Sequence, residues 1–134
     1  MFDRSLYHSL KQNSCCRISG NEEHFMIHYP DKFGESYSDL YLLGDGIILL
    51  YNHIRTKNLS SVISDVADKM ILPGNMMIVN ICNEGRCEIM PDDGKMFSLA
   101  RKRVAISRHL PTSDFKYPDS YFDGLELFID LDKV

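Results

Sequence analysis

The sequence has no long apolar run, no secretory leader and no excess of basic residues. Its longest apolar stretches, such as residues 47–51 and 76–79, are far too short to cross a bilayer. No cationic start leads into an apolar run, so a secretory signal is not indicated. The 15 Lys and Arg residues are outnumbered by 19 Asp and Glu residues, giving a net charge of −4, whereas direct nucleic-acid binding needs a basic surface. We therefore expect a cytoplasmic protein with no membrane partner.

The familiar motifs of catalysis are also missing. The four cysteines include no CxxC pair, so neither a zinc knuckle nor a thioredoxin-like redox site is indicated. There is no Gly-x-Ser-x-Gly nucleophile elbow, and the one Gly-x-Gly, at Gly44-Asp45-Gly46, lacks the helix that a phosphate-binding loop needs. We expect a protein that is not an enzyme, with thiols that cytosolic glutathione keeps reduced.

What the sequence does have is the composition and turn pattern of one small β-rich domain. Its 134 residues suit a single domain, and 44% apolar with 25% charged residues is typical of globular proteins. Turn signals such as Asp45-Gly46 and Pro118-Asp119 separate short segments rich in β-branched and aromatic residues, which favours a sandwich or barrel. We expect strands near residues 24–29, 46–55, 76–83, 86–90, 95–99, 104–108 and 121–131.

Two segments have helical features. Residues 2–10 include Asp3, which suits an N-cap, and place Leu6 and Leu10 on one side. Residues 59–70 carry apolar side chains at helical spacing, but their serines and β-branched residues have weak helix propensity. For residues 58–70 a helix and a loop with one short strand both stay open. Residues 30–39 are polar, and we expect a loop there.

Alternation predicts which faces of two strands are buried. In residues 121–131 Leu125, Leu127 and Ile129 share one face, and Glu126 and Asp130 lie on the other. This is the pattern of an antiparallel sheet with one face in water, so the acidic face is expected to be wet. Residues 47–50 are apolar at every position, which indicates a strand covered on both sides.

The Glu84-Gly85 pair predicts a β-hairpin. With a two-residue loop, Asn83 and Arg86 close the turn and Cys82 lies opposite Cys87. Glycine in that turn supplies a positive φ without steric strain. The two cysteines then share a face, where a disulfide is geometrically conceivable. We favour free thiols that pack as small apolar groups.

The hairpin sequence also forms part of a family resemblance. In order and spacing, four segments resemble the N-terminal sensor domain of AraC-type bacterial transcription regulators, over roughly residues 40–132: residues 47–55, the run Asn80-Ile81-Cys82-Asn83-Glu84-Gly85-Arg86-Cys87-Glu88, residues 115–118, and the ending Gly124-Leu125-Glu126-Leu127. The resemblance implies an all-β fold, a cupin-like antiparallel β-barrel or jelly roll with one or two short helices. The chain departs from the family at Arg101-Lys102-Arg103, where a Gly-Asp turn is usual.

The same resemblance implies a domain organisation and a role. Residues 1–39 would form an N-terminal helix, first strand and loop joined to the barrel, and residues 40–134 the sensor barrel, together making one domain. The family joins this sensor to a C-terminal pair of helix-turn-helix motifs, which we do not find in this sequence. DNA would then be a partner only through that separate domain, and a sugar or other metabolite would be the effector.

The spacing of a metal-binding cupin motif is present, but its ligands are changed. Gly74, Asn80, Cys82, Cys87 and Gly94 occupy the positions at which metal-binding cupins have Gly, His, His, Glu and Gly. Asparagine is a poor ligand for transition metals, so we expect no metal and no other cofactor. A zinc site made by the two thiolates with His53 or His109 is the alternative.

These observations give a candidate ligand pocket and no catalytic residue. Asn80, Cys82 and Cys87 are expected to face the barrel interior, and Tyr51 and His53 share a face of a neighbouring strand and would add hydrogen bonds. The predicted function is ligand sensing by a regulatory domain. The alternatives are a small cupin enzyme with a bound metal and a barrel that only mediates homodimerisation.

Overall fold

The computed structural model describes residues 3–59, 61–62, 65–66, 70, 72–90, 96–108 and 114–134. It is a mainly antiparallel β structure, as the sequence predicts. The strands, in chain order, are β1 (Arg17–Gly20), β2 (His24–His28), β3 (Tyr37–Leu42), β4 (Ile47–Ile54), β5 (Met76–Met90), β6 (Phe97–Ala100), β7 (Val104–Ser107), β8 (Asp114–Lys116) and β9 (Phe122–Asp130). The described ranges also contain the helix α1 (Ser5–Asn13) and the 3₁₀ turn η1 (Asp31–Phe33).

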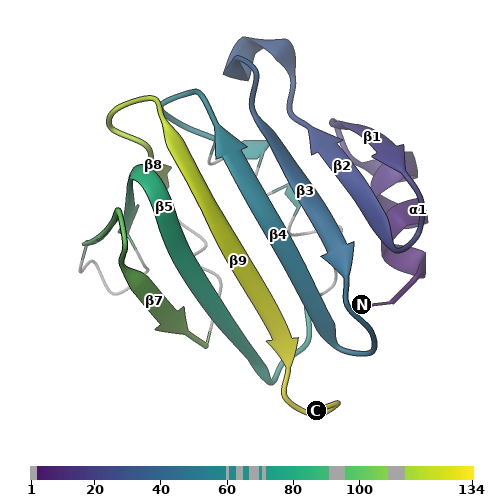
Figure 1. Cartoon of the computed structure of the whole chain (residues 1–134). Helices are drawn as coiled ribbons and strands as arrows, with labels where there is room; N and C mark the ends of the chain where they lie inside the picture. Colours follow the sequence, from purple (N-terminus) through teal and green to yellow (C-terminus); the bar gives the residue numbers. More distant parts are fainter. Residues whose placement is uncertain are drawn as a thin grey trace.

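One broad sheet dominates the molecule. Its strands follow the order β1-β2-β3-β4-β9-β5, and β7 pairs with the first half of β5 on the far edge. The second half of β5 leaves this sheet and pairs with β6 and β8 instead. In Figure 1 the broad sheet faces the viewer and α1 lies behind β1 and β2. The core therefore lies on the rear side of the sheet.

β5 is a single strand, which corrects the predicted hairpin at Glu84-Gly85. The chain does not reverse there: Cys82 pairs with Gly124, Glu84 pairs with Asp123, and the extra residue Asn83 makes a bulge. Gly85 has a φ of +81°, and a Cβ on it would lie 2.1 Å from the carbonyl oxygen of Tyr121. Glycine is needed here as predicted, but it lets β5 bend from one sheet into the other and does not form a hairpin turn.

The strand β9 has the opposite faces from those predicted. Glu126 and Phe128 point to the core side, and Asp130 is buried there as well. Leu125, Leu127 and Ile129 are half-buried and lie on the other face of the sheet. Because side chains alternate along a strand, pairing of Leu50 with Glu126 and of Ile78 with Phe128 fixes this orientation for the whole strand.

Three strands were missed, and the loop predicted for residues 30–39 is partly wrong. β1, β3 and β8 are short or polar, with little of the alternation that marks a strand. Only η1 and its flanks form the loop, because β3 already begins at Tyr37. β3 is held between β2 and β4 by full ladders on both sides, so its neighbours make it a strand.

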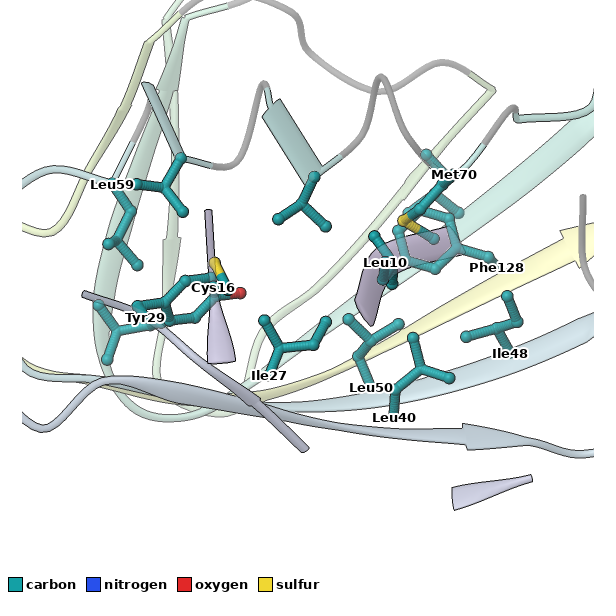
Figure 2. Packing of buried hydrophobic residues seen from close by; sticks show 14 of the residues in the cluster. Leu10, Cys16, Ile27, Tyr29, Leu40, Ile48, Leu50, Leu59, Met70 and Phe128 are labelled. Atoms are coloured by element: carbon teal, nitrogen blue, oxygen red, sulfur yellow. The ribbon is translucent and has the colours of Figure 1, made fainter. Parts of the chain in front are cut away.

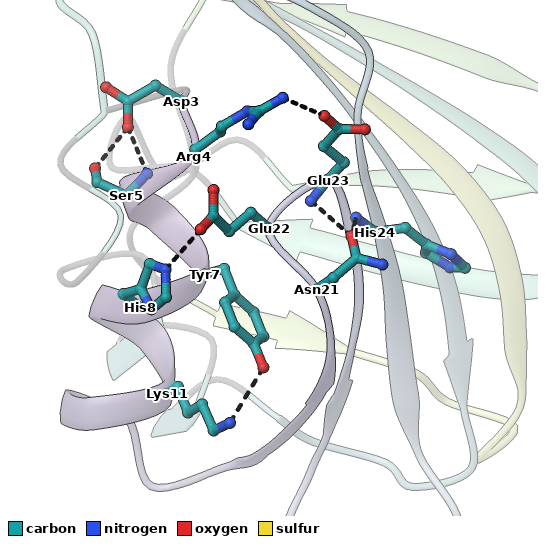
Figure 3. Close-up of polar contacts among 10 residues, drawn as sticks. All are labelled: Asp3, Arg4, Ser5, Tyr7, His8, Lys11, Asn21, Glu22, Glu23 and His24. Carbon is teal, nitrogen blue, oxygen red and sulfur yellow. Dashed lines mark hydrogen bonds and ion pairs between the residues drawn. The ribbon is translucent and has the colours of Figure 1, made fainter.

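The helix α1 begins three residues later than expected. The Asp3 carboxylate accepts hydrogen bonds from the Ser5 hydroxyl at 2.5 Å and from the Ser5 backbone N–H at 2.8 Å, and these bonds lower the pKa of Asp3. Leu6 and Leu10 are buried against the core, as the spacing predicts. On the solvent side of the helix, exposed side chains form ion pairs with the turn between β1 and β2. One of these pairs joins Arg4 and Glu23 at 2.6 Å (Figure 3).

In the 58–70 segment Ser61, Val62, Asp65, Val66 and Met70 have helical backbone, whereas Asn58 and Leu59 do not. These described residues favour the helix over the loop with one short strand. Figure 2 shows Leu59 and Met70 on the side of the core opposite the sheet residues Ile27 and Leu50. Leu59 and Met70 therefore lie across the core from the sheet. In the described part of the chain no helix has the length and apolar character to cross a membrane.

Candidate functional site

A cavity of about 70 Å³ lies between the broad sheet, the smaller sheet of β5, β6 and β8, and the residues Val66 and Met70. Its wall is mainly aliphatic and aromatic, and Asn52, Asn80 and Glu126 bring amide and carboxyl groups into it. The described lining residues are Ile27, Tyr29, Leu50, Asn52, Val66, Met70, Asn80, Cys87, Ile89, Leu99, Tyr117, Phe122, Glu126 and Phe128. A concave apolar site with a few converging polar groups is the usual form of a small-molecule site.

Three adjacent strands bring the polar groups together. Glu126 on β9 lies directly opposite Asn80 on β5. Asn52 on β4 lies opposite Gly124, which places it diagonally next to Glu126 on the same face. The Asn52 amide donates to Glu126 Oε1 at 3.1 Å, and the side chain of Asn80 is a second hydrogen-bond partner of this carboxylate.

A chain of hydrogen bonds orients the Asn52 amide. Ser38 Oγ donates to Asn52 Oδ1 at 2.6 Å, so the amide nitrogen is left to face Glu126. Tyr29 Oη lies 2.6 Å from Ser38 Oγ and must be the donor there, because the Ser38 hydrogen is already used. Three donors in a row therefore point toward the carboxylate. Among the described side chains, no buried nitrogen or oxygen is left without a partner.

Glu126 is the only acidic side chain among the described residues of the cavity wall. Burial raises its pKa above the ordinary value of 4.5, and the hydrogen bonds from Asn52 and Asn80 oppose that rise. The described residues provide no lysine, arginine or histidine partner for it. The wall thus contains a carboxyl group that amides stabilise and no described cation neutralises.

The thiol of Cys87 lies in the same wall and is held in its neutral form. Burial raises the pKa of Cys87 to about 12, with the negative charge of Glu126 as the next cause. A thiol with so high a pKa is a weak nucleophile at neutral pH, because only the thiolate reacts. Cys87 therefore contributes a small, weakly polar surface to the cavity. All four cysteines of the chain are free.

The five predicted pocket residues separate into two groups. Asn80 and Cys87 line the cavity. Cys82 is buried but its Sγ lies 3.3 Å from the Gly85 carbonyl oxygen, at the bulge and outside the described wall. Tyr51 and His53 are on the opposite face of the sheet, because they are the odd-numbered neighbours of the inward-facing Leu50 and Asn52. The structure removes these three from the cavity.

Tyr51 and His53 belong to a separate polar cluster on the outer face. His53 Nδ1 lies 2.9 Å from Asp123 Oδ1, and Arg55 forms a two-pronged pair with both oxygens of Asp123 at 3.2 and 3.0 Å. Burial alone would raise the pKa of Asp123, but the hydrogen bond and charge of Arg55 lower it below the usual value. The ring of Tyr37 stacks on His53 at 4.7 Å. This cluster joins the end of β4 to the start of β9.

The described residues of the cavity do not fit a transition-metal centre. They offer one carboxylate and one protonated thiol, and the two amides already donate to that carboxylate. Cupin-type centres use imidazole and carboxylate ligands, and no histidine is among the described wall residues. No group of three His, Cys, Asp or Glu side chains in the described ranges is arranged to hold a metal. His109, named as a zinc ligand in the alternative, lies outside those ranges.

Sequence reasoning missed Glu126, Asn52 and Tyr29. The sequence does contain a signal for Glu126: the closing strand has apolar residues on both of its faces, so its acidic residue can lie on either face. Choosing the wet face for it required the assumption that the strand has only one apolar face. Phe122 and Phe128 share the face of Glu126, so the sequence already shows that this strand has two apolar faces and that the assumption does not hold.

Comparison with solved structures shows a cupin-like fold. No family model matches the sequence, and no curated protein matches it. An RmlC-like cupin protein from Desulfovibrio desulfuricans aligns with a TM-score of 0.50 and 10% identity, over 77% of this chain and 88% of that chain. KdgF from Halomonas sp. aligns with a TM-score of 0.51 and 7% identity, over 70% of this chain and 77% of that chain.

A third similar structure is that of FeII HppE. It aligns with a TM-score of 0.53 and 9% identity, over 84% of this chain and 59% of that chain. At such identities the likeness shows the fold alone. The fold is therefore an all-β, cupin-like jelly roll with short helices, as the resemblance in the sequence implies.

Proposed function

We propose that this domain binds a small molecule in its interior cavity and is the cytoplasmic ligand-sensing part of an AraC-type transcription regulator. The cavity is the observation that carries the proposal. Its largely apolar wall and its oriented polar group, Glu126 with Asn52 and Asn80, are features of a binding site. A fully packed core would not need an oriented carboxylate in its interior.

Binding without catalysis is favoured by the chemistry of the described wall. Its one sulfur is a thiol with a pKa of about 12, and no described histidine lies beside it to act as a base. The residues present can select and orient a ligand. For regulation, the ligand must bind one arrangement of sensor and DNA-binding domain more tightly than the other, because equal affinity shifts no equilibrium.

A thermal-shift screen of sugars, amines and other metabolites tests the binding part of the proposal. A hit should lose its effect in Asn80→Leu, which removes one polar group from the cavity wall. The matched control is Tyr51→Phe, which changes a polar group on the outer face of the sheet. A stabilisation that survives Asn80→Leu and disappears in Tyr51→Phe would place the site on the outer face and overturn the cavity proposal.

The regulatory part has its own test. The coding sequence that follows the codon for Val134 in the native gene should specify two helix-turn-helix units. A reporter under the control of the intact regulator should then respond to the hit compound, and the response should be lost with Asn80→Leu. A gene without a DNA-binding region would overturn the regulatory role and leave the binding site in place.

Homodimerisation is a second candidate function, and the outer face of the sheet favours it. Apolar side chains from four adjacent strands form a continuous surface there, which we call the outer apolar face. Its members are Ile47, Leu49, Tyr51, Met77, Val79, Ile81, Val104, Ile106, Leu125, Leu127 and Ile129, and they stand in register across β4, β9, β5 and β7. All are half-buried or exposed, and no described element covers them in Figure 1.

A second copy of the chain fits the chemistry of this surface. Large continuous apolar patches on a monomer usually mark an interaction site. The outer apolar face has no charged member and borders the cluster of His53, Arg55 and Asp123 at one end, so two copies related by a twofold axis can bury its apolar side chains against each other. Dimerisation is compatible with ligand sensing, because the two surfaces lie on opposite sides of the sheet.

A further inference from the structure

Glu126 suggests which class of molecule the cavity takes, on the basis of the proposed binding function. Its carboxyl group is oriented by Asn52 and Asn80 and lies in an apolar wall. A carboxylate in such surroundings is stable only when a cation pairs with it or a proton neutralises it. The described residues supply neither a lysine nor an arginine. Among the described residues the group therefore lacks a cationic partner, and it is suited to pair with a cationic ligand.

The direction of the hydrogen bonds supports a charged form of Glu126. Tyr29 donates to Ser38, Ser38 donates to Asn52, and Asn52 donates to the carboxylate, so each bond points a hydrogen toward the negative charge. Such an arrangement stabilises a hydrogen-bond acceptor, which favours the carboxylate over the carboxylic acid. A ligand that donates from the cavity side would complete the coordination of the carboxylate.

The rest of the wall suits a small amine. It is largely apolar, which suits the carbon chain, and it includes the rings of Tyr117, Phe122 and Phe128, which can attract an ammonium group. A space of about 70 Å³ is smaller than the roughly 150 Å³ cavity that can hold benzene, so it admits a ligand of only a few non-hydrogen atoms. An anionic ligand would be repelled by Glu126. A sugar would bury several hydroxyls against a wall that has few polar partners.

We infer that the cavity binds a short primary alkylamine, whose ammonium group pairs with the Glu126 carboxylate and whose carbon chain packs against the apolar wall. This assigns to Glu126 the part of the anionic anchor. Asn52 and Asn80 are positioning residues, because they hold the carboxylate in place.

Isothermal titration at pH 7 with ethylammonium, propylammonium and butylammonium chlorides tests this inference directly. The control ligand is n-propanol, which matches propylammonium in shape and lacks the charge. We expect saturable binding of at least one amine, and at least about tenfold weaker binding of the alcohol. Glu126→Gln, which keeps the shape of the side chain, should weaken amine binding by about tenfold or more.

Glu84→Gln is the matched control variant. Glu84 is an exposed glutamate in β5, next to the bulge at Asn83, and it is not among the described residues that line the cavity. Its replacement removes one negative charge from the molecule and should leave amine binding unchanged. Equal losses in the two variants would mean that amines bind through general charge attraction, and would overturn the inference.

A measurement on the wild-type chain avoids any effect of substitution on folding. The pKa of Glu126, followed by ¹³C NMR of its carboxyl carbon, should fall when propylammonium is added, because a cation favours the charged form. By linkage, amine affinity should rise with pH through the pKa of Glu126, above the ordinary value of 4.5. An unchanged pKa at saturating amine would overturn the inference.

The results separate this inference from the proposed function on which it rests. A neutral metabolite that binds in the cavity, with no response to any of the three amines, would overturn the amine inference and keep the binding function. Cavity variants that leave every hit from the screen unaffected would overturn both.

Discussion

At the scale of single residues, Glu126 and Leu127 lie on the opposite faces of the sheet from those that hydrophobicity alone predicts. Glu126 points into the cavity and Leu127 lies on the outer face. The carboxylate is tolerated inside because two amides from neighbouring strands bond to it. The leucine is tolerated outside because it stands in register between Leu49 and Val79, which cover part of its surface. An interior acid at a site of this kind is more informative than the apolar residues around it.

Gly85 is the residue at which substitution should have the clearest structural effect. Its φ is +81°, and an added Cβ would lie 2.1 Å from the Tyr121 carbonyl oxygen. We expect Gly85→Ala to lower the free energy of unfolding by about 2 kcal/mol or more, from backbone strain together with the displaced carbonyl. Urea denaturation of the two proteins measures the difference.

Gly74→Ala is the control for this prediction. No atom lies within 4 Å of a Cβ at Gly74, so its replacement should change stability by no more than about 0.5 kcal/mol. A Gly85→Ala variant as stable as the wild type would mean that β5 does not make the bend described here.

At the scale of elements, the fold depends on β5 serving two sheets. Its first half pairs with β9 and β7, and its second half with β6 and β8. The bulge at Asn83 lets one strand change sheets, and this brings Asn80 and Cys87, on either side of the bend, into one cavity. The sequence Asn-Glu-Gly is equally suited to a turn, so only the pairing partners distinguish a bend from a hairpin.

The junction of β4 and β9 gives a prediction at this scale. Asp123 accepts hydrogen bonds from both arms of the Arg55 guanidinium, and its side chain is only 11% exposed. Asp123→Asn should lower the free energy of unfolding by about 1–3 kcal/mol at pH 7, because a partly buried charged hydrogen bond is lost. Asp119→Asn is the control, since the Asp119 side chain is 54% exposed in its pair with Arg86, and should lose about 0–1 kcal/mol.

The pH dependence of this difference follows from the pKa of Asp123, which the pair with Arg55 lowers below the usual 3.8. A lowered pKa in the folded state means that the stabilisation is present above pH 3.8 and is lost as the pH falls through the folded-state value. The stability gap between wild type and Asp123→Asn should therefore close in acid. A gap that stays constant down to acid pH would show that the ion pair does not stabilise the junction.

At the scale of the whole molecule, the sheet separates two surfaces with different chemistry. The cavity lies behind the sheet, enclosed with the help of the segment that carries Val66 and Met70. The outer apolar face lies in front. A two-layer arrangement of this kind explains why residues 47–50 are apolar at every position: Ile48 and Leu50 are buried in the core, and Ile47 and Leu49 belong to the outer apolar face.

If a second copy covers the outer apolar face, sedimentation velocity should show a dimer whose fraction rises with protein concentration. Ile106→Glu places a charge on this face at a position 67% exposed in the single chain, and should raise the dimer dissociation constant about tenfold or more. Val134→Glu, at a position 68% exposed and outside this face, should leave it unchanged. A wild-type chain that stays monomeric at high concentration would contradict the dimer.

By itself, the sequence determined the β-rich class, the helix near Leu6 and Leu10, and most strand positions, because these follow from turn residues and from the local spacing of apolar side chains. It also pointed to Asn80 and Cys87. The tertiary structure alone decided which face of β9 is interior, that Glu84-Gly85 bends and does not turn, and that Tyr51 and His53 lie apart from the cavity. These features depend on which strands pair and in which register, and a strand with two apolar faces contains no local signal that distinguishes inside from outside.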